Sequence, residues 1–333
     1  MRICIIGGGS LGHVCAGVFA SVGARVNIYS QHPESWGEEV RVVDIDGKPY
    51  IGHIDTVSSN PGDVIPNADM VFLCLPGFLI EQSLESIKPH LRPNTVVGSI
   101  VSSTGFFFCA HKILPPSTPL FGFQRTPFIA RVAEYGQSAN LLGYKKEVAI
   151  ACENIDDTEA FRAQVERLFI TPTKLLGSFY EASLTNSNPI LHTGRLYSMW
   201  RDWDGTPYDH NILFYREWND AASECIIAMD DEFMQLLAKL PVNRANIPSL
   251  LDYYESTDAK SLTGKISSIA AFQTIKSPMK EVAGGWIPDF ASRYFTEDFP
   301  FGLKIIKELA EEHHIATPTI DKVYQWGMNV INQ

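Results

Sequence analysis

The chain has 333 residues, of which 45% are hydrophobic, and a formal net charge of −11. This hydrophobic content excludes an intrinsically disordered chain, and the length suggests two domains as a soft prior. The negative charge, with lysine and arginine scattered along the chain, argues against a nucleic-acid-binding surface. No apolar run approaches the roughly 20 residues that a membrane helix needs, so we expect no membrane partner.

The six cysteines show no spacing typical of metal ligands, so no metal site is expected. Cys4 and Cys74 fall in apolar segments predicted as buried strands, where cysteine behaves as a small hydrophobic residue. Reduced thiols are typical of the cytoplasm, and the folded pattern starts at residue 2 with no signal peptide before it. We therefore expect a cytoplasmic protein, and the sequence leaves open whether it is a homodimer.

A glycine pattern near the start of the chain stands between a predicted strand and a predicted helix. Residues 3–6 are apolar, as in a strand buried on both faces, and residues 11–19 have a helical apolar pattern. In this context G-x-G-x-x-G predicts a dinucleotide-binding turn, with the pyrophosphate on amides at the helix N-terminus. The alternative is a glycine-rich turn without a ligand. The cofactor-binding residues predicted here are Gly7, Gly9, Ser10, Leu11 and Gly12.

The end of the second predicted strand, residues 24–29, bears on which dinucleotide binds. An NAD enzyme usually has an acidic residue there for the ribose 2′-hydroxyl, whereas this strand is followed by Ser30, Gln31 and His32. Ser30 and Gln31 can donate hydrogen bonds to a 2′-phosphate, although no arginine, the usual phosphate partner, follows at once. We therefore predict NADP or NAD, with a slight preference for NADP. The alternative is that these are ordinary polar residues at a strand end.

Strands and helices alternate as far as residue 177. Strands are predicted at 68–75, 95–101 and 120–123, an antiparallel pair at 40–54 turned at Asp46-Gly47, and two more strands within 140–151. Helices are predicted at 80–91, 106–113 and 156–169. This alternation predicts an α/β fold with a Rossmann-type, doubly wound parallel sheet covered by helices. Leu75 and Pro76 end one strand on the side where cofactor loops gather, so they are further candidate cofactor-binding residues.

The pattern becomes mostly helical after residue 177. Helices are predicted at 181–200, 217–240, 245–254, 267–274 and 302–314. We therefore predict a dinucleotide-binding Rossmann domain over 1–177 and an α-helical substrate and catalytic domain over 178–333.

Two clusters in the helical domain hold residues able to carry chemistry. Asn188 and His192 are four residues apart and share a helix face. Histidine transfers protons near neutral pH, and asparagine can bind a carbonyl or carboxylate group. In the second cluster, Arg293 can clamp a carboxylate with two hydrogen bonds, and Asp298 can orient an imidazole. Each cluster also has a purely structural interpretation, as the start of a helix at a proline.

Taken in order, four motifs resemble the opine dehydrogenase family, the octopine/nopaline dehydrogenase-type oxidoreductases. They are Gly7-x-Gly9-x-x-Gly12, Leu75-Pro76-Gly77, Asn188-Pro189-Ile190-Leu191-His192 and Arg293-x4-Asp298-Phe299-Pro300-Phe301-Gly302-Leu303. The resemblance covers nearly the whole chain. It implies reduction of the imine formed from a 2-oxo acid and an amino acid, so these small molecules are the expected partners.

The resemblance also implies roles for single residues. His192 is then the general acid and base, with Asp298 as its catalytic partner. Arg293 binds a substrate carboxylate, with Asn188 beside the histidine as a further substrate-binding residue. Gln124 is a weaker match to a substrate contact.

Two other functions stay open at this point. A 2-oxo acid reductase or dehydrogenase of the ketopantoate reductase or glycerol-3-phosphate dehydrogenase type shares the architecture. Such enzymes use a lysine at the entrance of the helical domain, whereas residues 180–192 contain none. A non-catalytic NAD(P)-binding regulator would need no histidine–aspartate pair, so the distance between His192 and Asp298 separates it from the leading hypothesis.

Overall fold

The computed structural model describes residues 1–332, and the chain divides into two compact units, one over Met1–Ser183 and the other from Leu184 onward. The boundary predicted at 177 lies before helix α6 (Phe179–Ser183). That helix packs on strands of the first unit, which is why the division comes after it.

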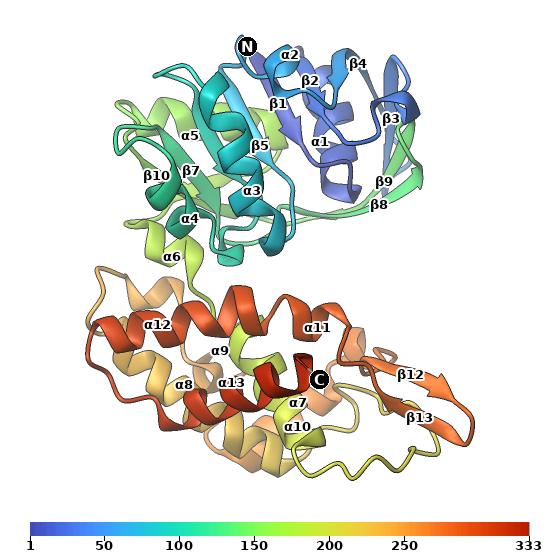
Figure 1. Cartoon of the computed structure of the whole chain (residues 1–333), viewed down its shortest axis with the longest axis vertical. Helices are drawn as coiled ribbons and strands as arrows, with labels where there is room; N and C mark the ends of the chain where they lie inside the picture. The colour runs from blue at the N-terminus through green and yellow to red at the C-terminus, as the bar shows by residue number, and fades with distance from the viewer. Residues whose placement is uncertain (333) are drawn as a thin grey trace. The chain divides into compact units, whose positions relative to one another are not determined.

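Eleven strands of the first unit form one sheet, within residues 1–332, in the order β11-β10-β7-β6-β5-β1-β2-β4-β3-β9-β8 (Figure 1). The strands are β1 (Arg2–Ile6), β2 (Arg25–Tyr29), β3 (Glu39–Asp44), β4 (Pro49–Ser58), β5 (Met70–Leu73), β6 (Val96–Ser99), β7 (Leu120–Phe123), β8 (Phe128–Glu134), β9 (Ser138–Tyr144), β10 (Val148–Glu153) and β11 (Thr173–Leu175).

The middle of this sheet is the predicted doubly wound fold. The run β4-β2-β1-β5-β6-β7 is parallel throughout, and its order is that of a Rossmann sheet with β4 in the place of the third strand. The strand order reverses between β1 and β5, and dinucleotides bind at the carboxyl ends of the strands at such a point. The predicted fold class, an α/β Rossmann-type sheet followed by a mostly helical domain, is confirmed.

The sheet is not parallel over its whole width, although the alternation of strands and helices predicted a parallel sheet apart from the antiparallel pair at 40–54, which is confirmed. Strands β3 and β4 are antiparallel, as are β8 and β9, and β10 runs antiparallel to β7. The first two pairs are joined by short turns, which can connect only antiparallel strands. Strand β8 was not predicted, because Pro127 precedes it and its residues Arg131 and Glu134 break the apolar pattern.

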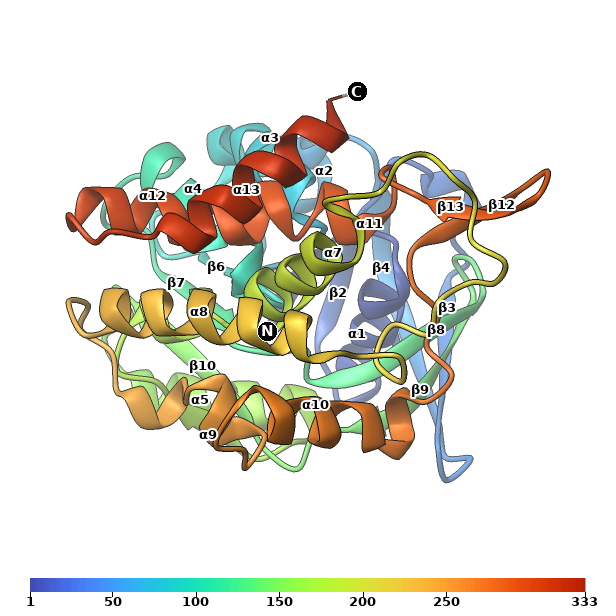
Figure 2. The same ribbon diagram turned by 90° about the horizontal axis from the view of Figure 1, so that it is seen from below.

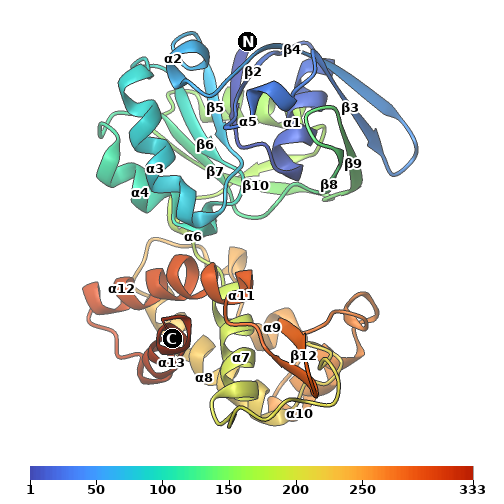
Figure 3. The ribbon, with the colours of Figure 1, turned by 45° about the vertical axis from the view of Figure 1, so that its right-hand side comes forward.

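The additional strands curl around helix α1 (Ser10–Ser21), which lies between β1 and the β3–β9–β8 extension (Figure 3). Strand β4 makes the bend, because its second half pairs with β2 and its first half with β3. A Cβ atom on Gly52 would lie 2.6 Å from the carbonyl oxygen of Gly17, so glycine is needed where α1 and β4 approach. Helix α1 is therefore covered on most sides, which explains its almost wholly apolar sequence.

Helices cover both faces of the parallel sheet. One face packs on α1 and α5, and the other on α3 and α4, which lie side by side in front of the sheet in Figure 3. The remaining helices of this unit are α2 (Pro61–Val64), α3 (Gly77–Ile87), α4 (Phe106–Ile113) and α5 (Thr158–Phe169), with short 3₁₀ helices at Pro33–Ser35, Lys88–His90 and Ser102–Thr104.

The second unit is mostly helical, and α7, α8 and α13 pack against one another within it (Figure 2). A hairpin of β12 (Met279–Val282) and β13 (Gly285–Pro288), which the sequence did not indicate, projects from the helices. The helices are α7 (Thr193–Trp200), α8 (Asp220–Leu237), α9 (Leu250–Tyr253), α10 (Ala259–Ser268), α11 (Arg293–Thr296), α12 (Lys304–Glu312) and α13 (Pro318–Ile331), with 3₁₀ helices at Arg244–Asn246 and Ala270–Phe272. No helix within residues 1–332 is both long and apolar enough to cross a membrane.

The helix predicted over 181–200 is broken into three pieces. Helix α6 ends at Ser183, a π-helix η4 (Ser187–His192) follows, and α7 continues from Thr193. Pro189 lies inside η4, and proline lacks the backbone N–H that a continuous α-helix needs. A second π-helix, η7 (Phe299–Leu303), contains Pro300 and leads into α12.

Candidate active site

The loop between β1 and α1 has the shape that a dinucleotide requires. Gly7 has a φ of +110°, and a Cβ atom there would lie 2.7 Å from the carbonyl oxygen of Cys74. A Cβ atom on Gly12 would overlap the carbonyl oxygen of Gly7, so the third glycine lets α1 pack on the turn. At Gly9, by contrast, a Cβ atom would meet nothing within 4 Å. Gly7 and Gly12 thus allow close packing within the protein, whereas Gly9, the second glycine of the motif, leaves open space for a ligand.

The start of α1 offers hydrogen-bond donors beside this open space. Gly9 is its N-cap, and no side chain within the described residues caps the helix. Amides at a helix N-terminus bind anionic groups such as phosphate. The Ser10 hydroxyl accepts the N–H of Val132 at 3.1 Å and keeps its own proton for donation, while Leu11 packs on the core.

Leu75 and Pro76 lie close to the same turn. The Leu75 side chain would be 2.9 Å from a Cβ atom on Gly7, and Pro76 is the N-cap of α3. The fold therefore places the loops after β1 and β5 next to each other, at the point where the strand order reverses.

Ser30 and Gln31, predicted to contact the ribose or its phosphate, differ in exposure. Ser30 is 5% exposed, and its Oγ accepts the backbone N–H of His32 and the indole N–H of Trp36, both at 3.2 Å. The Tyr135 hydroxyl lies 3.5 Å from the same oxygen. Gln31 is exposed. Trp36 and Tyr135 come from other segments, and no sequence pattern linked them to the end of β2.

A buried histidine ties the tip of the β8–β9 hairpin to the glycine loop. His13 Nδ1 donates to the carbonyl oxygen of Gly9 at 3.0 Å, and His13 Nε2 accepts the N–H of Gly136 at 2.7 Å. The ring stacks on Trp36 with centroids 4.3 Å apart. Burial lowers the pKa of His13, which keeps the imidazole neutral and suits this pairing of one donor with one acceptor nitrogen.

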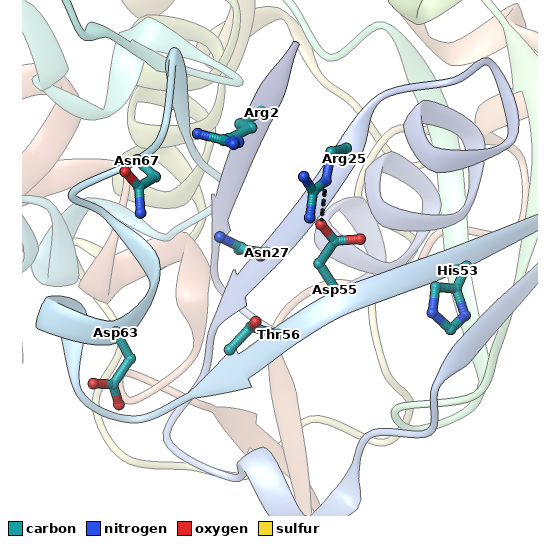
Figure 4. Close-up of a pocket in the computed structure, with 8 residues that line it drawn as sticks. All are labelled: Arg2, Arg25, Asn27, His53, Asp55, Thr56, Asp63 and Asn67. Atoms are coloured by element: carbon teal, nitrogen blue, oxygen red, sulfur yellow. Dashed lines mark hydrogen bonds and ion pairs between the residues drawn. The ribbon is translucent and has the colours of Figure 1, made fainter.

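A polar hollow of about 430 Å³ lies on the sheet near the first residues of β1 and β2, away from the glycine loop that follows β1 (Figure 4). Its charges partly cancel, because Arg25 forms an ion pair of 2.7 Å with Asp55. Within residues 1–332, no three His, Cys, Asp or Glu side chains gather as metal ligands would. The hollow is lined by Arg2, Arg25, Asn27, His53, Asp55, Thr56, Asp63 and Asn67.

His192 and Asp298 meet in the second unit. His192 Nδ1 lies 2.9 Å from Asp298 Oδ2, and both side chains are 14% exposed. The two π-helices bring them together, since His192 ends η4 and Asp298 directly precedes η7. A Cβ atom on Gly302 would lie 2.9 Å from the Pro189 ring, so glycine lets the π-helices pack closely. Single π-helical turns are often found at functional sites.

The other predicted substrate-binding residues are placed differently. The Arg293 side chain is 81% exposed, and its nearest carboxylate oxygen, on Glu297, is 3.9 Å away. Asn188 is exposed in η4. Gln124 belongs to the first unit, where its side-chain amide donates to the carbonyl oxygen of Glu181 at 2.9 Å. Within the described residues of the second unit, His192 is thus hydrogen-bonded to Asp298, and neither side chain is hydrogen-bonded or ion-paired to Arg293 or Asn188.

Two residues that the sequence analysis missed complete the surroundings of His192. The Tyr215 hydroxyl lies 2.9 Å from His192 Nε2, and the Tyr294 ring lies over the imidazole with centroids 4.8 Å apart. Tyr294 lies within the Arg293-x4-Asp298 motif, although the analysis gave it no role. Tyr215 carried no signal, because 23 residues separate it from His192 and no spacing rule connects them.

Both units of the chain are similar to known proteins. Residues 175–331 match the family model of the NAD/NADP octopine/nopaline dehydrogenase alpha-helical domain, and residues 3–105 match that of ketopantoate reductase PanE/ApbA. Tauropine dehydrogenase of Arabella iricolor is 28% identical, covering 99% of this chain and 91% of its own length. Octopine dehydrogenase of Mizuhopecten yessoensis is 25% identical, covering 100% of this chain and 90% of its own.

An octopine dehydrogenase structure with NADH and L-arginine superimposes with a TM-score of 0.90 at 25% identity, covering 100% of this chain and 90% of that one. The family model over 175–331, the tauropine and octopine dehydrogenase relatives and the octopine dehydrogenase structure together support the opine dehydrogenase family. The resemblance seen in the four sequence motifs is thereby confirmed. The predicted cofactor class, NAD or NADP, agrees with this opine dehydrogenase match, while the slight preference for NADP stays a prediction.

Proposed function

We propose that this chain is an NAD(P)H-dependent oxidoreductase that reductively condenses a 2-oxo acid with an amino acid through an imine. The observation that carries the proposal is the 2.9 Å hydrogen bond between His192 and Asp298, in a chain whose relatives include octopine and tauropine dehydrogenases. The L-arginine in the octopine dehydrogenase structure supports an amino acid as one substrate. The 2-oxo acid is what the family resemblance implies.

The cofactor supplies a hydride, and the protein must hold the reactants and move protons. Gly7, Gly9 and Gly12 form the turn that would hold the pyrophosphate, with the amides at the start of α1 as donors. Leu75 lines the neighbouring loop. Open space at the second glycine is the structural feature that supports this fit.

His192 is the proposed general base and acid. Asp298 holds the imidazole through Nδ1 and stabilises its protonated form. The imidazole takes a proton from the ammonium group of the amino acid, so that the amine can attack the 2-oxo carbon. After the attack the nitrogen passes one of its protons to the carbonyl oxygen, and the imidazolium returns the first proton to the resulting hydroxyl group, which leaves as water as the protonated imine forms. The exposed Arg293 is the proposed partner of a substrate carboxylate.

A simple 2-oxo acid reductase is the second candidate. It is favoured by the match of residues 3–105 to the ketopantoate reductase model, a match confined to the dinucleotide-binding part. A non-catalytic regulator is disfavoured, since it would not need a histidine and an aspartate at hydrogen-bonding distance.

The test is a screen of NADH and NADPH oxidation against pairs of 2-oxo acids and amino acids, with mass spectrometry of the product. We expect turnover that requires both substrates and a product whose mass is that of a secondary amine dicarboxylate or its analogue. Turnover with the 2-oxo acid alone, giving a hydroxy acid, would favour the reductase. Gly9→Asp is the negative control, because its side chain would enter the space left for the cofactor.

A further inference from the structure

The surroundings of His192 leave neither ring nitrogen without a partner. Nδ1 is hydrogen-bonded to Asp298 and Nε2 to the hydroxyl of Tyr215, each at 2.9 Å. If Asp298 accepts from Nδ1–H, then Nε2 is the acceptor nitrogen and the phenol donates to it. A substrate can therefore exchange a proton with the imidazole only through the Tyr215 oxygen or after Tyr215 has moved away.

Tyr215 is held firmly in this place by aromatic neighbours. Its ring stacks on Phe272 with centroids 4.5 Å apart, and it lies within 9° of parallel to the Trp218 indole at 6.2 Å. Phe214 meets its edge at 4.9 Å. Only 8% of the residue is exposed. Rotation of the side chain away from His192 would break these contacts together.

The backbone that carries Tyr215 is fixed as well. The Arg195 guanidinium, 1% exposed, donates to the carbonyl oxygens of Phe214 at 3.3 Å and Glu217 at 2.6 Å, and lies over the Trp218 ring. His192 is the N-cap of α7 and Arg195 lies three residues later, so the histidine and the residue that anchors its tyrosine are one helical turn apart. These contacts hold the Tyr215 hydroxyl within hydrogen-bonding distance of His192 Nε2.

We propose, on the basis of the function proposed above, that Tyr215 relays protons between His192 Nε2 and the substrate. A phenol can accept one hydrogen bond and donate another. When the imidazole is protonated, its Nε2–H donates to the Tyr215 oxygen, and the phenol proton is free to turn to a substrate atom. The imidazolium proton then passes to the phenol oxygen as the phenol proton passes to the substrate.

The balance of this step is one proton lost by the imidazolium and one gained by the substrate, with the phenol unchanged. The reverse sequence removes a proton from the substrate ammonium group. Burial raises the pKa of Tyr215 well above its usual range, so the hydroxyl keeps its proton at neutral pH and is always able to donate.

The first test is Tyr215→Phe, which keeps the ring and removes only the hydroxyl. With the substrate pair that supports turnover, we expect kcat to fall by about 100-fold, the lower end of what a positioned acid–base group contributes, with little change in either KM. Tyr197→Phe is the matched control, because it removes the phenol hydroxyl of a buried tyrosine of α7 whose ring packs on Trp326. If the kcat of Tyr215→Phe equals that of the wild type, the relay is overturned and Tyr215 only packs against His192. If it is higher, the relay is also overturned and Tyr215 blocks access to the imidazole.

The second test separates a relay from a structural role. In mixtures of light and heavy water, two protons in flight make the plot of kcat against deuterium fraction curved, whereas one makes it straight. We expect a curved plot for the wild type and a straight one for Tyr215→Phe. A plot of the same shape for both proteins would contradict the proposal.

A measurement that needs no turnover tests the hydrogen bond between Tyr215 and His192 independently of the proposed function. In ¹⁵N NMR of the free protein, the His192 Nε2 resonance should move in Tyr215→Phe toward that of a ring nitrogen without a donor, while Nδ1 stays in place. An unchanged Nε2 resonance would refute the hydrogen bond itself. If the resonance moves but no substrate pair is turned over, the hydrogen bond is present and the proposed reaction is wrong.

Discussion

His192 Nδ1 and Asp298 Oδ2 lie 2.9 Å apart although 106 residues separate them in the chain. If this pair moves the proton, His192→Ala should reduce kcat by about two to four orders of magnitude, the usual contribution of a positioned acid–base group. Asp298→Asn should act in the same direction, because it leaves the imidazole in place without a negative partner. Steady-state kinetics with the active substrate pair checks both.

The matched control is His313→Ala, which removes a histidine at the end of α12 in the same unit. His192→Ala and Asp298→Asn should both keep the nucleotide affinity of the wild type. Near wild-type turnover in His192→Ala would mean that the resemblance concerns the fold alone.

Gly9 borders the open space in the glycine loop, so Gly9→Asp would put a side chain and a negative charge where the pyrophosphate must approach. We expect NAD(P)H affinity to collapse while the fold survives, since a Cβ atom at this position meets nothing within 4 Å. Fluorescence titration and a melting curve measure the two effects. Gly143→Asp in β9 is the control, because a side chain there also enters open space. Equal affinities of the Gly9 variant and the wild type would disprove the cofactor site.

The end of β2 should set the nucleotide preference. With Ser30 and Gln31 in place of an acidic residue, we expect the wild type to bind NADPH at least as tightly as NADH. Ser30→Asp should shift the preference toward NADH, because a carboxylate repels a 2′-phosphate and accepts from a ribose 2′-hydroxyl. Since Ser30 is buried, Gln31→Asp, at an exposed position, gives the same test with less risk to folding. Tighter NADH binding by the wild type would contradict the prediction.

Arg293→Ala should mainly raise the KM for the 2-oxo acid, with a smaller effect on kcat, since it removes a carboxylate partner. The side chain is 81% exposed, so stability should change little. The KM of each reactant should be measured in turn. An arginine binds phosphate as readily as carboxylate, so a rise confined to the KM of NAD(P)H would reassign Arg293 to the cofactor.

Asp230 gives a stability prediction that depends on pH. Burial raises the pKa of Asp230 to about 6, against the effect of two donors, the Leu250 N–H at 2.6 Å and the Asn186 amide at 2.8 Å. Between about pH 4 and pH 6 the folded protein keeps a proton that the unfolded chain releases. The free energy of unfolding should therefore fall as pH rises through this window, by about 3 kcal/mol for a shift of roughly two pKa units.

The measurement is urea unfolding of the wild type and of Asp230→Asn, which does not titrate. The difference between the two should change with pH across this window, the wild type losing stability relative to the variant as pH rises. Asp231→Asn, at the exposed neighbouring position, removes one of the smaller causes of the raised pKa, so it should reduce the pH dependence only slightly. A pH-independent difference between wild type and Asp230→Asn would contradict the raised pKa.

Several features could be predicted because they depend on neighbours in the chain. The strand, turn and helix around Gly7, Gly9 and Gly12 are contiguous, and Gly7 and Gly12 make the close approaches that their spacing indicates, while the role of Gly9 in cofactor binding stays a prediction. The hairpin turned at Asp46-Gly47 is equally local, and β3 and β4 pair as expected. His192 and Asp298 were singled out through motifs, and their meeting was expected from the resemblance rather than from any rule of spacing.

What only the tertiary structure decided involves residues brought together from distant segments. Tyr215 reaches His192 because Arg195 pins the turn that carries it, and no periodicity in either segment records this contact. Tyr135 reaches Ser30 from the turn after β8, a strand that the sequence analysis did not find. The close packing of η4 on η7, where Gly302 meets Pro189, likewise follows from no local pattern. Local sequence determines backbone preference and hydrophobic faces, whereas contacts across long separations follow from how those faces pack.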